Sequence, residues 1–211
     1  MLDHLLVDVI GAIRRSLDQA LLERQAVEER FQVDVFLGDV SWETSYSLPG
    51  EEQPPRVRAD LSVDWPTWSQ TAYRSWSIGE APAELPEVVL EVAMRIQRLA
   101  EAPPADRVLA VLPSAGPLLG QEPLVRSSTT IEEVRTDPDA DPGDRGGGGA
   151  PPVRWAVEAT YEGSIRFDET HLDDPGTLEP VVDALTRWIS STLVQLADLP
   201  LAFLPPDPDE D

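Results

Sequence analysis

Apolar residues recur at spacings of three and four along the start of the chain, and then at a spacing of two. Residues 2–30 carry a single apolar stripe, which predicts a long amphipathic helix. Beyond it, apolar and polar positions alternate, as in half-buried strands. This alternation predicts an antiparallel meander with strands at 31–37, 40–48, 57–65 and 69–78.

The rest of the chain repeats both kinds of pattern. Helical spacing returns twice, and Pro103-Pro104 ends the first of these stretches. Short apolar or alternating runs predict further strands, with a turn at Glu162-Gly163. The expected elements are helices at 85–100 and 177–197, strands at 108–112, 124–134, 153–161 and 164–167, and an extended arm at 199–204.

One pattern occurs twice. Two strand-like runs and an amphipathic stretch occupy 57–100, and a similar series occupies 153–196. The predicted fold is α+β, a mostly antiparallel sheet covered by three main helices. Two pseudo-repeated strand–strand–helix halves are one form of it, although few positions are identical and common ancestry of the halves does not follow.

Residues 1–204 are expected to form a single domain, with halves at about 1–102 and 105–204. The segment 136–152 is rich in Asp, Pro and Gly and predicts a flexible loop, and 205–211 is an acidic tail. The order of helix, strands, helix, strands and helix is similar in layout to that of α+β secretion chaperones.

Charge narrows the classes of partner. The chain has 39 acidic and 16 basic residues, for a net charge of −23. This charge repels phosphate backbones and anionic lipid, so neither nucleic acid nor membrane is an expected partner. Another protein, favoured if it is basic, is the expected partner, and a homodimer is open as well.

Composition also bears on the setting of the protein. All sixteen basic residues are Arg, and Lys, Asn and Cys are absent. Because Lys and Asn have A-rich codons, this bias predicts a high-GC bacterium. Charges interrupt the N-terminal apolar run, so no signal peptide is expected and a cytoplasmic location is predicted.

No motif indicates a cofactor, metal or catalytic centre. Asp137, Asp139 and Asp141 resemble the start of a calcium loop, but Pro142 and Gly148 occupy the positions that require Gly and Glu. Histidine 171 and nearby acids supply parts of a catalytic triad without a Gly-x-Ser-x-Gly elbow. Phosphate-binding loops are absent from the sequence.

An aromatic cluster is the remaining unusual feature, and it has two interpretations. Its residues either fill the core between sheet and helices or form a surface for a partner. Strand alternation would place Trp68 and Trp76 on one face and Tyr73 on the other. The candidate interaction surface comprises Trp65, Trp68, Tyr73, Arg74 and Trp76.

The leading hypothesis is a non-enzymatic adaptor, chaperone or accessory subunit. A small enzyme with a carboxylate and Arg pocket, or an acidic mimic of nucleic acid, are the alternatives. A binding protein predicts an exposed apolar patch and an enzyme predicts a deep pocket of pKa-perturbed carboxylates. A mimic predicts carboxylates in rows on one face.

Overall fold

One antiparallel sheet of seven strands organises the molecule, which confirms the α+β class. A computed structural model describes residues 4–21, 27–36, 38–48, 54–134 and 153–205. The strand order is β1-β2-β3-β4-β7-β6-β5. The strands are β1 (Val27–Phe36), β2 (Asp39–Ser47), β3 (Val57–Trp65), β4 (Glu87–Leu99), β5 (Ala115–Leu118), β6 (Pro123–Val134) and β7 (Arg154–Arg166).

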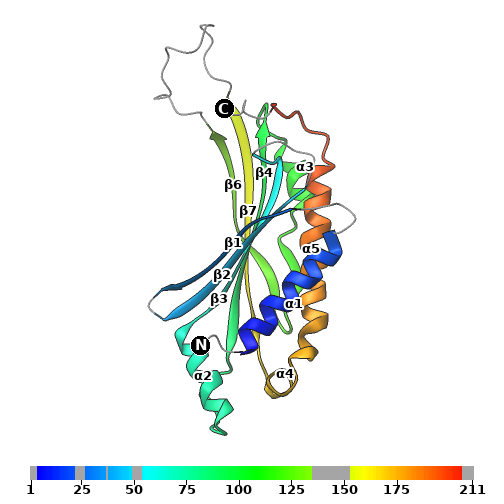
Figure 1. The fold of residues 1–211 in the computed structure, drawn as a ribbon. Helices are drawn as coiled ribbons and strands as arrows, with labels where there is room; N and C mark the ends of the chain where they lie inside the picture. The colour runs from blue at the N-terminus through cyan, green and yellow to red at the C-terminus, as the bar shows by residue number, and fades with distance from the viewer. Residues whose placement is uncertain (1–3, 22–26, 37, 49–53, 135–152, 206–211) are drawn as a thin grey trace.

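Two long helices cover one face of this sheet (Figure 1). They are α1 (His4–Leu21) and α5 (Glu179–Ala197). The Ser16 hydroxyl of α1 donates to Asp183 of α5 at 2.8 Å and lies 2.6 Å from the Thr186 hydroxyl. Shorter helices are α2 (Thr67–Ser77), α3 (Ala105–Val111), α4 (Glu169–Asp173) and the 3-10 turn η3 (Pro175–Leu178).

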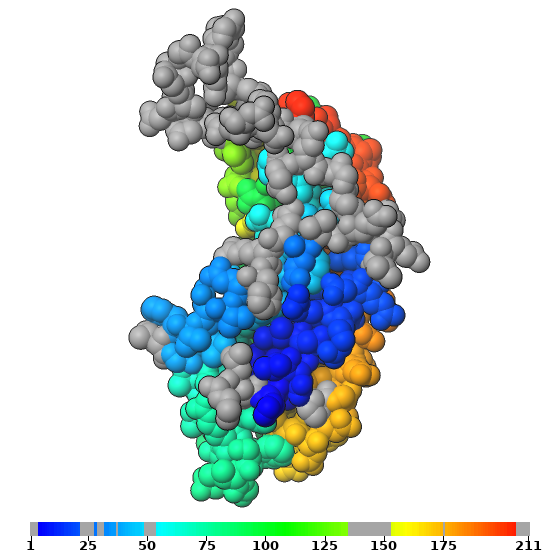
Figure 2. All heavy atoms as spheres, in the orientation of Figure 1, coloured from blue at the N-terminus to red at the C-terminus, as the bar shows by residue number. Residues whose placement is uncertain are grey.

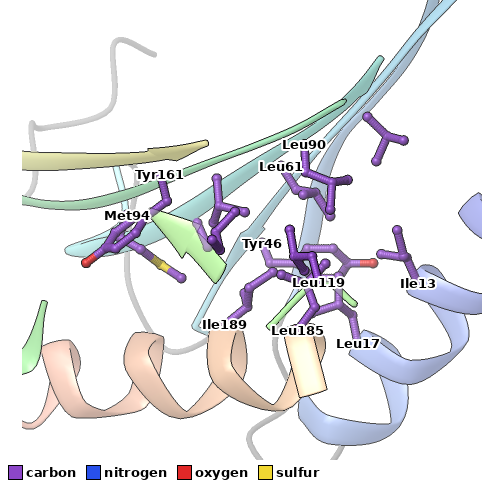
Figure 3. Close-up of a cluster of buried hydrophobic side chains, with 14 of the residues drawn as sticks. Ile13, Leu17, Tyr46, Leu61, Leu90, Met94, Leu119, Tyr161, Leu185 and Ile189 are labelled. Atoms are coloured by element: carbon purple, nitrogen blue, oxygen red, sulfur yellow. The ribbon is translucent and has the colours of Figure 1, made fainter. Parts of the chain in front are cut away.

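The core lies between the sheet and these two helices (Figure 3). Ile13 and Leu17 of α1 and Leu185 and Ile189 of α5 are all at most 1 % exposed. They face the apolar side of the central strands, whose Tyr161 ring meets Trp188 of α5 edge-on at 4.8 Å. Sheet residues drawn with them are Tyr46, Leu61, Leu90, Met94 and Tyr161.

The predicted helix at 85–100 is wrong, because this segment forms β4. Strand β4 pairs with both β3 and β7. Its buried residues alternate with partly exposed ones, and Val88, Leu90, Val92, Met94 and Ile96 are all 0 % exposed. Helical spacing also fits this sequence, but its run of β-branched residues favours the extended form.

The predicted strand at 69–78 is also wrong, because it falls within helix α2. Ser69, Ala72, Tyr73 and Trp76 have the spacing of one helix face, and all four are at least partly buried. Ala72 and Trp76 lie four residues apart, a spacing that fits one face of a strand as well as one face of a helix. Pro66, which directly precedes the helix, is a better guide to its start.

Three further predictions change. The first helix does not run through residue 30, because β1 begins at Val27 and pairs with β2 as far as Ser47. Residues 108–111 belong to α3 rather than to a strand. The expected turn at Glu162-Gly163 is the middle of one long β7, where a Cβ on Gly163 would lie 2.7 Å from Leu119.

The pseudo-repeat is not present in the element order. The first half contains strand β3, helix α2 and strand β4, whereas β7 leads into α4, η3 and α5. Strands expected at 40–48, 57–65 and 124–134 and the helix at 177–197 are confirmed. The predicted loop at 136–152 and residues 206–211 of the tail lie outside the described residues. None of the helices described is long and apolar enough to cross a membrane.

Arg98 joins the end of β4 to the C-terminal arm. It lies at a β-bulge with a φ of 63° and is 4 % exposed. Its guanidinium donates to the Leu204 carbonyl at 2.7 and 3.2 Å and to the Pro54 carbonyl at 3.0 Å. The arm, predicted as extended, pairs at Phe203 with Leu99. One side chain therefore holds three distant segments together.

Two substitutions of Arg98 separate the contribution of its side-chain hydrogen bonds from the strain of its positive φ. Arg98→Ala removes the buried charged hydrogen bonds, and we expect a loss of about 3 kcal/mol in the free energy of unfolding. Arg98→Gly removes the same bonds but tolerates the positive φ, so it should be about 1 kcal/mol more stable than Arg98→Ala. Urea unfolding measures both, and equal stability of the two variants would contradict backbone strain at this position.

Candidate interaction surface

The predicted aromatic cluster divides into core and surface. Trp65 ends β3, is 1 % exposed, and its ring lies 5.9 Å from those of Tyr73 and Phe167. It is therefore a core residue, in contrast to its place in the predicted surface. Trp68 is 43 % exposed, and Arg74 is exposed on the same helix, α2.

Helix geometry changes which aromatic residues meet. Tyr73 and Trp76 lie three residues apart on α2, and their half-buried rings stack with centroids 6.2 Å apart. The prediction that Tyr73 faces away from Trp76 is wrong, because it assumed a strand. Tyr73 also touches Trp65, so the three rings connect the helix to the core. Trp68, on the same helix, keeps much of its surface exposed.

Hydrogen bonds attach the start of α2 to the turn between β1 and β2. The Asp39 carboxylate accepts from the Thr67 backbone N–H at 2.5 Å and from its hydroxyl at 2.7 Å. Gln70 donates to the Gly38 carbonyl at 2.8 Å and to the Trp65 carbonyl at 3.0 Å. Asp39 thus caps a helix that belongs to another part of the chain.

The Gly38 turn itself requires glycine. Its φ is +96°, and a Cβ at this position would lie 3.0 Å from the Thr67 hydroxyl. A side chain here would strain the backbone and push against the first residue of α2. The turn is therefore shaped both by the hairpin and by the neighbouring helix.

A second attachment fixes α2 to the beginning of β4. Ser69 is fully buried, and its hydroxyl donates to the Glu87 carbonyl at 2.6 Å and accepts from the Glu87 N–H at 2.7 Å. Helix α2 is thus attached both to the β1–β2 turn and to the start of β4. Its exposed residues have a defined position relative to the hairpin.

Large apolar side chains are exposed at this end of the molecule, where the β1–β2 hairpin and α2 lie beyond α1 (Figure 2). On the hairpin, Phe36 is 75 % and Val35 is 68 % exposed, while Ile78 after α2 is 72 % exposed. In the sequence, Phe36 interrupts the polar phase of its strand, and this was the available signal for a surface role. Val33 and Val35 lie on one face of β1, and Phe36 lies on the other. We define the hairpin–α2 surface as the exposed apolar residues of this end with Arg74, namely Val33, Val35, Phe36, Trp68, Arg74 and Ile78.

The sheet face opposite the long helices is acidic. The strand register places Glu43, Glu91 and Glu162 in one row, with Ser62 between the first two. Burial and the neighbouring carboxylates, Glu162 first, raise the pKa of Glu91. Glu43 and Glu91 line a shallow groove of about 290 Å³. We call Glu43, Glu91 and Glu162 the acidic row.

Elsewhere a cleft of about 310 Å³ is lined by Ser164, Asp168 and His171, and His171 Nδ1 lies 2.9 Å from the Asp168 carboxylate. Within the described ranges no hydrogen bond joins Ser164 to His171, as a catalytic triad would require. His171 is part of a capping box, in which its Nδ1 accepts from the Asp168 N–H at 3.3 Å. Ser164 donates to Glu87 at 3.1 Å, and Arg166 also binds Glu87, at 3.0 Å. Each of these polar groups thus has a structural partner. No group of three metal-ligating side chains occurs within the described ranges.

Removing the Asp39 carboxylate should loosen α2. We expect Asp39→Ala to lower the thermal midpoint, whereas Asp34→Ala on the same hairpin should change it little. Hydrogen bonds from Thr67 lower the pKa of Asp39 below its ordinary 3.8. Its stabilisation is therefore present above about pH 4 and is lost as the pH falls through the lowered pKa. Melting curves from neutral to acidic pH should converge for Asp39→Ala and wild type; a constant difference would contradict the capping role.

Comparison with known proteins identifies no relative of this chain. The chain matches no protein-family model, no curated protein sequence and no solved structure.

Proposed function

We propose that this chain is a non-enzymatic protein-binding protein, an adaptor, chaperone or accessory subunit in the cytoplasm of a high-GC bacterium. The exposed apolar side chains of the hairpin–α2 surface are the observation that carries the proposal. Trp68, Phe36 and Ile78 remain between 43 and 75 % exposed, although Tyr73 and Trp76 of the same region pack against the core. Aromatic and Arg side chains in such a position are typical of interface hot spots.

The firm attachment of α2 to the rest of the fold favours a binding role for its exposed apolar side chains. Asp39 and Ser69 hold α2 from two directions, so the helix backbone that carries Trp68 does not need to be ordered when a partner arrives. Pre-ordered segments bind with a smaller loss of conformational entropy. The surface therefore combines apolar area with a fixed shape.

The acidic row favours a second candidate, the mimic of nucleic acid. Its carboxylates lie on one face, as mimicry requires, and would compete for a basic groove. Two ion-paired arginines interrupt the same face: Arg58 binds Asp60 at 2.9 Å, and Arg95 binds Glu158 at 3.0 Å. A basic protein partner is compatible with both candidates, but only the adaptor uses the apolar hairpin–α2 surface.

Affinity purification of the tagged full chain from its native host, with mass spectrometry, tests the proposal. We expect one protein to co-purify with the wild type and to fall about tenfold in a Trp68→Ser, Ile78→Ser variant, because hot-spot truncations cost about 1.4 kcal/mol or more. Leu118→Ser is the matched control, since Leu118 is 61 % exposed on β5. A monomer without a partner that turns over a compound in a substrate screen would contradict the proposal.

A further inference from the structure

The two edges of the sheet differ in how they are protected. Strand β5 has only four residues, of which Pro117 has no N–H to offer, and it covers β6 only as far as Arg126. Among the described residues, no strand pairs with the outer side of β6 beyond Arg126, and this stretch carries Glu132 and Glu133. Strand β1 forms the other edge with ten residues and no proline. Among the described residues, no strand pairs with the outer side of β1. A long edge of this kind presents free N–H and C=O groups to another chain.

Apolar side chains lie along the exposed end of this edge. Val33 is 40 % and Val35 is 68 % exposed, and they share the sheet face of their β2 partners Trp42 and Val40. Proteins usually place charges on such an edge to prevent pairing with other chains. In β1 the charged residues are Glu28, Glu29 and Arg30 near its start and Asp34 between the two valines, and the exposed apolar side chains among the described residues lie toward its end.

The other face of β1 has a different chemistry. Gln32 and Asp34 alternate with the two valines, and the Gln32 amide donates to the Asp34 carboxylate. Gln32 lies opposite Glu43, which begins the acidic row. A strand added beside β1 would therefore place every second side chain next to Val33 and Val35, and the others next to Gln32 and Asp34, with Glu43 one strand further in.

Charge decides between a second copy and a different protein. Two copies would bring together chains of net charge −23 each, with Asp34 near the contact. A segment with Arg or Lys at alternate positions instead complements Asp34 and Glu43. The occupant is thus basic on one face and apolar on the other.

We infer that β1 accepts an extended segment of a basic partner protein as an eighth strand, with alternating apolar and basic side chains. The inference rests on the proposed function and adds the mode of binding and the chemistry of the partner. Main-chain hydrogen bonds provide the register, the two valines receive the apolar side chains, and Asp34 and Glu43 receive the cations. The added strand thus covers the β1 part of the hairpin–α2 surface, Val33 and Val35.

Fluorescence anisotropy of the full chain with a labelled eight-residue probe of alternating Val and Arg tests this mode. Two further probes carry N-methyl groups, one on every Val and the other on every Arg. All three probes have the same charge, but in each methylated probe the N-methyl groups remove the N–H donors along only one edge of the extended strand. We expect one methylated probe to bind at least tenfold more weakly than the parent and the other to bind like it. Equal binding of all three probes would overturn the inference, because attraction by charge alone does not distinguish edges.

Protein variants locate the binding edge. Val35→Lys should weaken binding of the parent probe at least tenfold relative to Ile131→Lys, which adds the same charge at a 41 % exposed position of β6. Equal weakening would overturn the assignment to β1. If Val35→Lys does not fold, the methylated probes on the wild type still decide. If the probe binds but no partner is captured from the host, the proposed function is refuted and the binding site at β1 is retained. If a partner is captured but the probe does not bind, the proposed function is retained and the binding site at β1 is refuted.

Discussion

Burial of one face of the sheet beneath α1 and α5 is the constraint on which the rest of the structure depends. The alternating residues of β4, which are 0 % exposed, provide the floor of this core, and Ile13, Leu17, Leu185 and Ile189 provide its cover. An antiparallel sheet needs only one covered face, so the other is left to solvent and to charge. The acidic row occupies that open face, where a strongly charged surface is compatible with folding.

The same constraint explains why unusual features gather at one end. The two long helices leave the β1–β2 hairpin and α2 beyond their cover (Figure 1). Hydrogen bonds accepted by Asp39 and donated by Gln70 and Ser69 hold this end, together with the packing of Tyr73 and Trp76 against the core. Exposed apolar groups on an ordered support, beside an acidic sheet face, are what a surface for a basic and partly apolar protein segment requires.

Sequence patterns predicted the fold class and the terminal helix, but not the assignment of the middle of the chain. The segment at 85–100 fits both periods, and only its place between β3 and β7 makes it a strand. Trp65 and Trp68 look equivalent in sequence, yet one ends a central strand and the other begins a helix at the border of the core. The cap from Asp39 to Thr67 joins residues 28 positions apart, which no local pattern reveals. Exposure of Val35 likewise depends on β1 being an edge.

Hydrogen–deuterium exchange of the full chain, alone and with the protein that co-purifies with it, tests the central claim most directly. The account predicts slower exchange on binding at Val33–Phe36 and in α2, because these segments gain main-chain partners or lose solvent contact. Slower exchange confined to α1 and α5 or to the cleft at Arg166, with the hairpin and α2 unchanged, would contradict it.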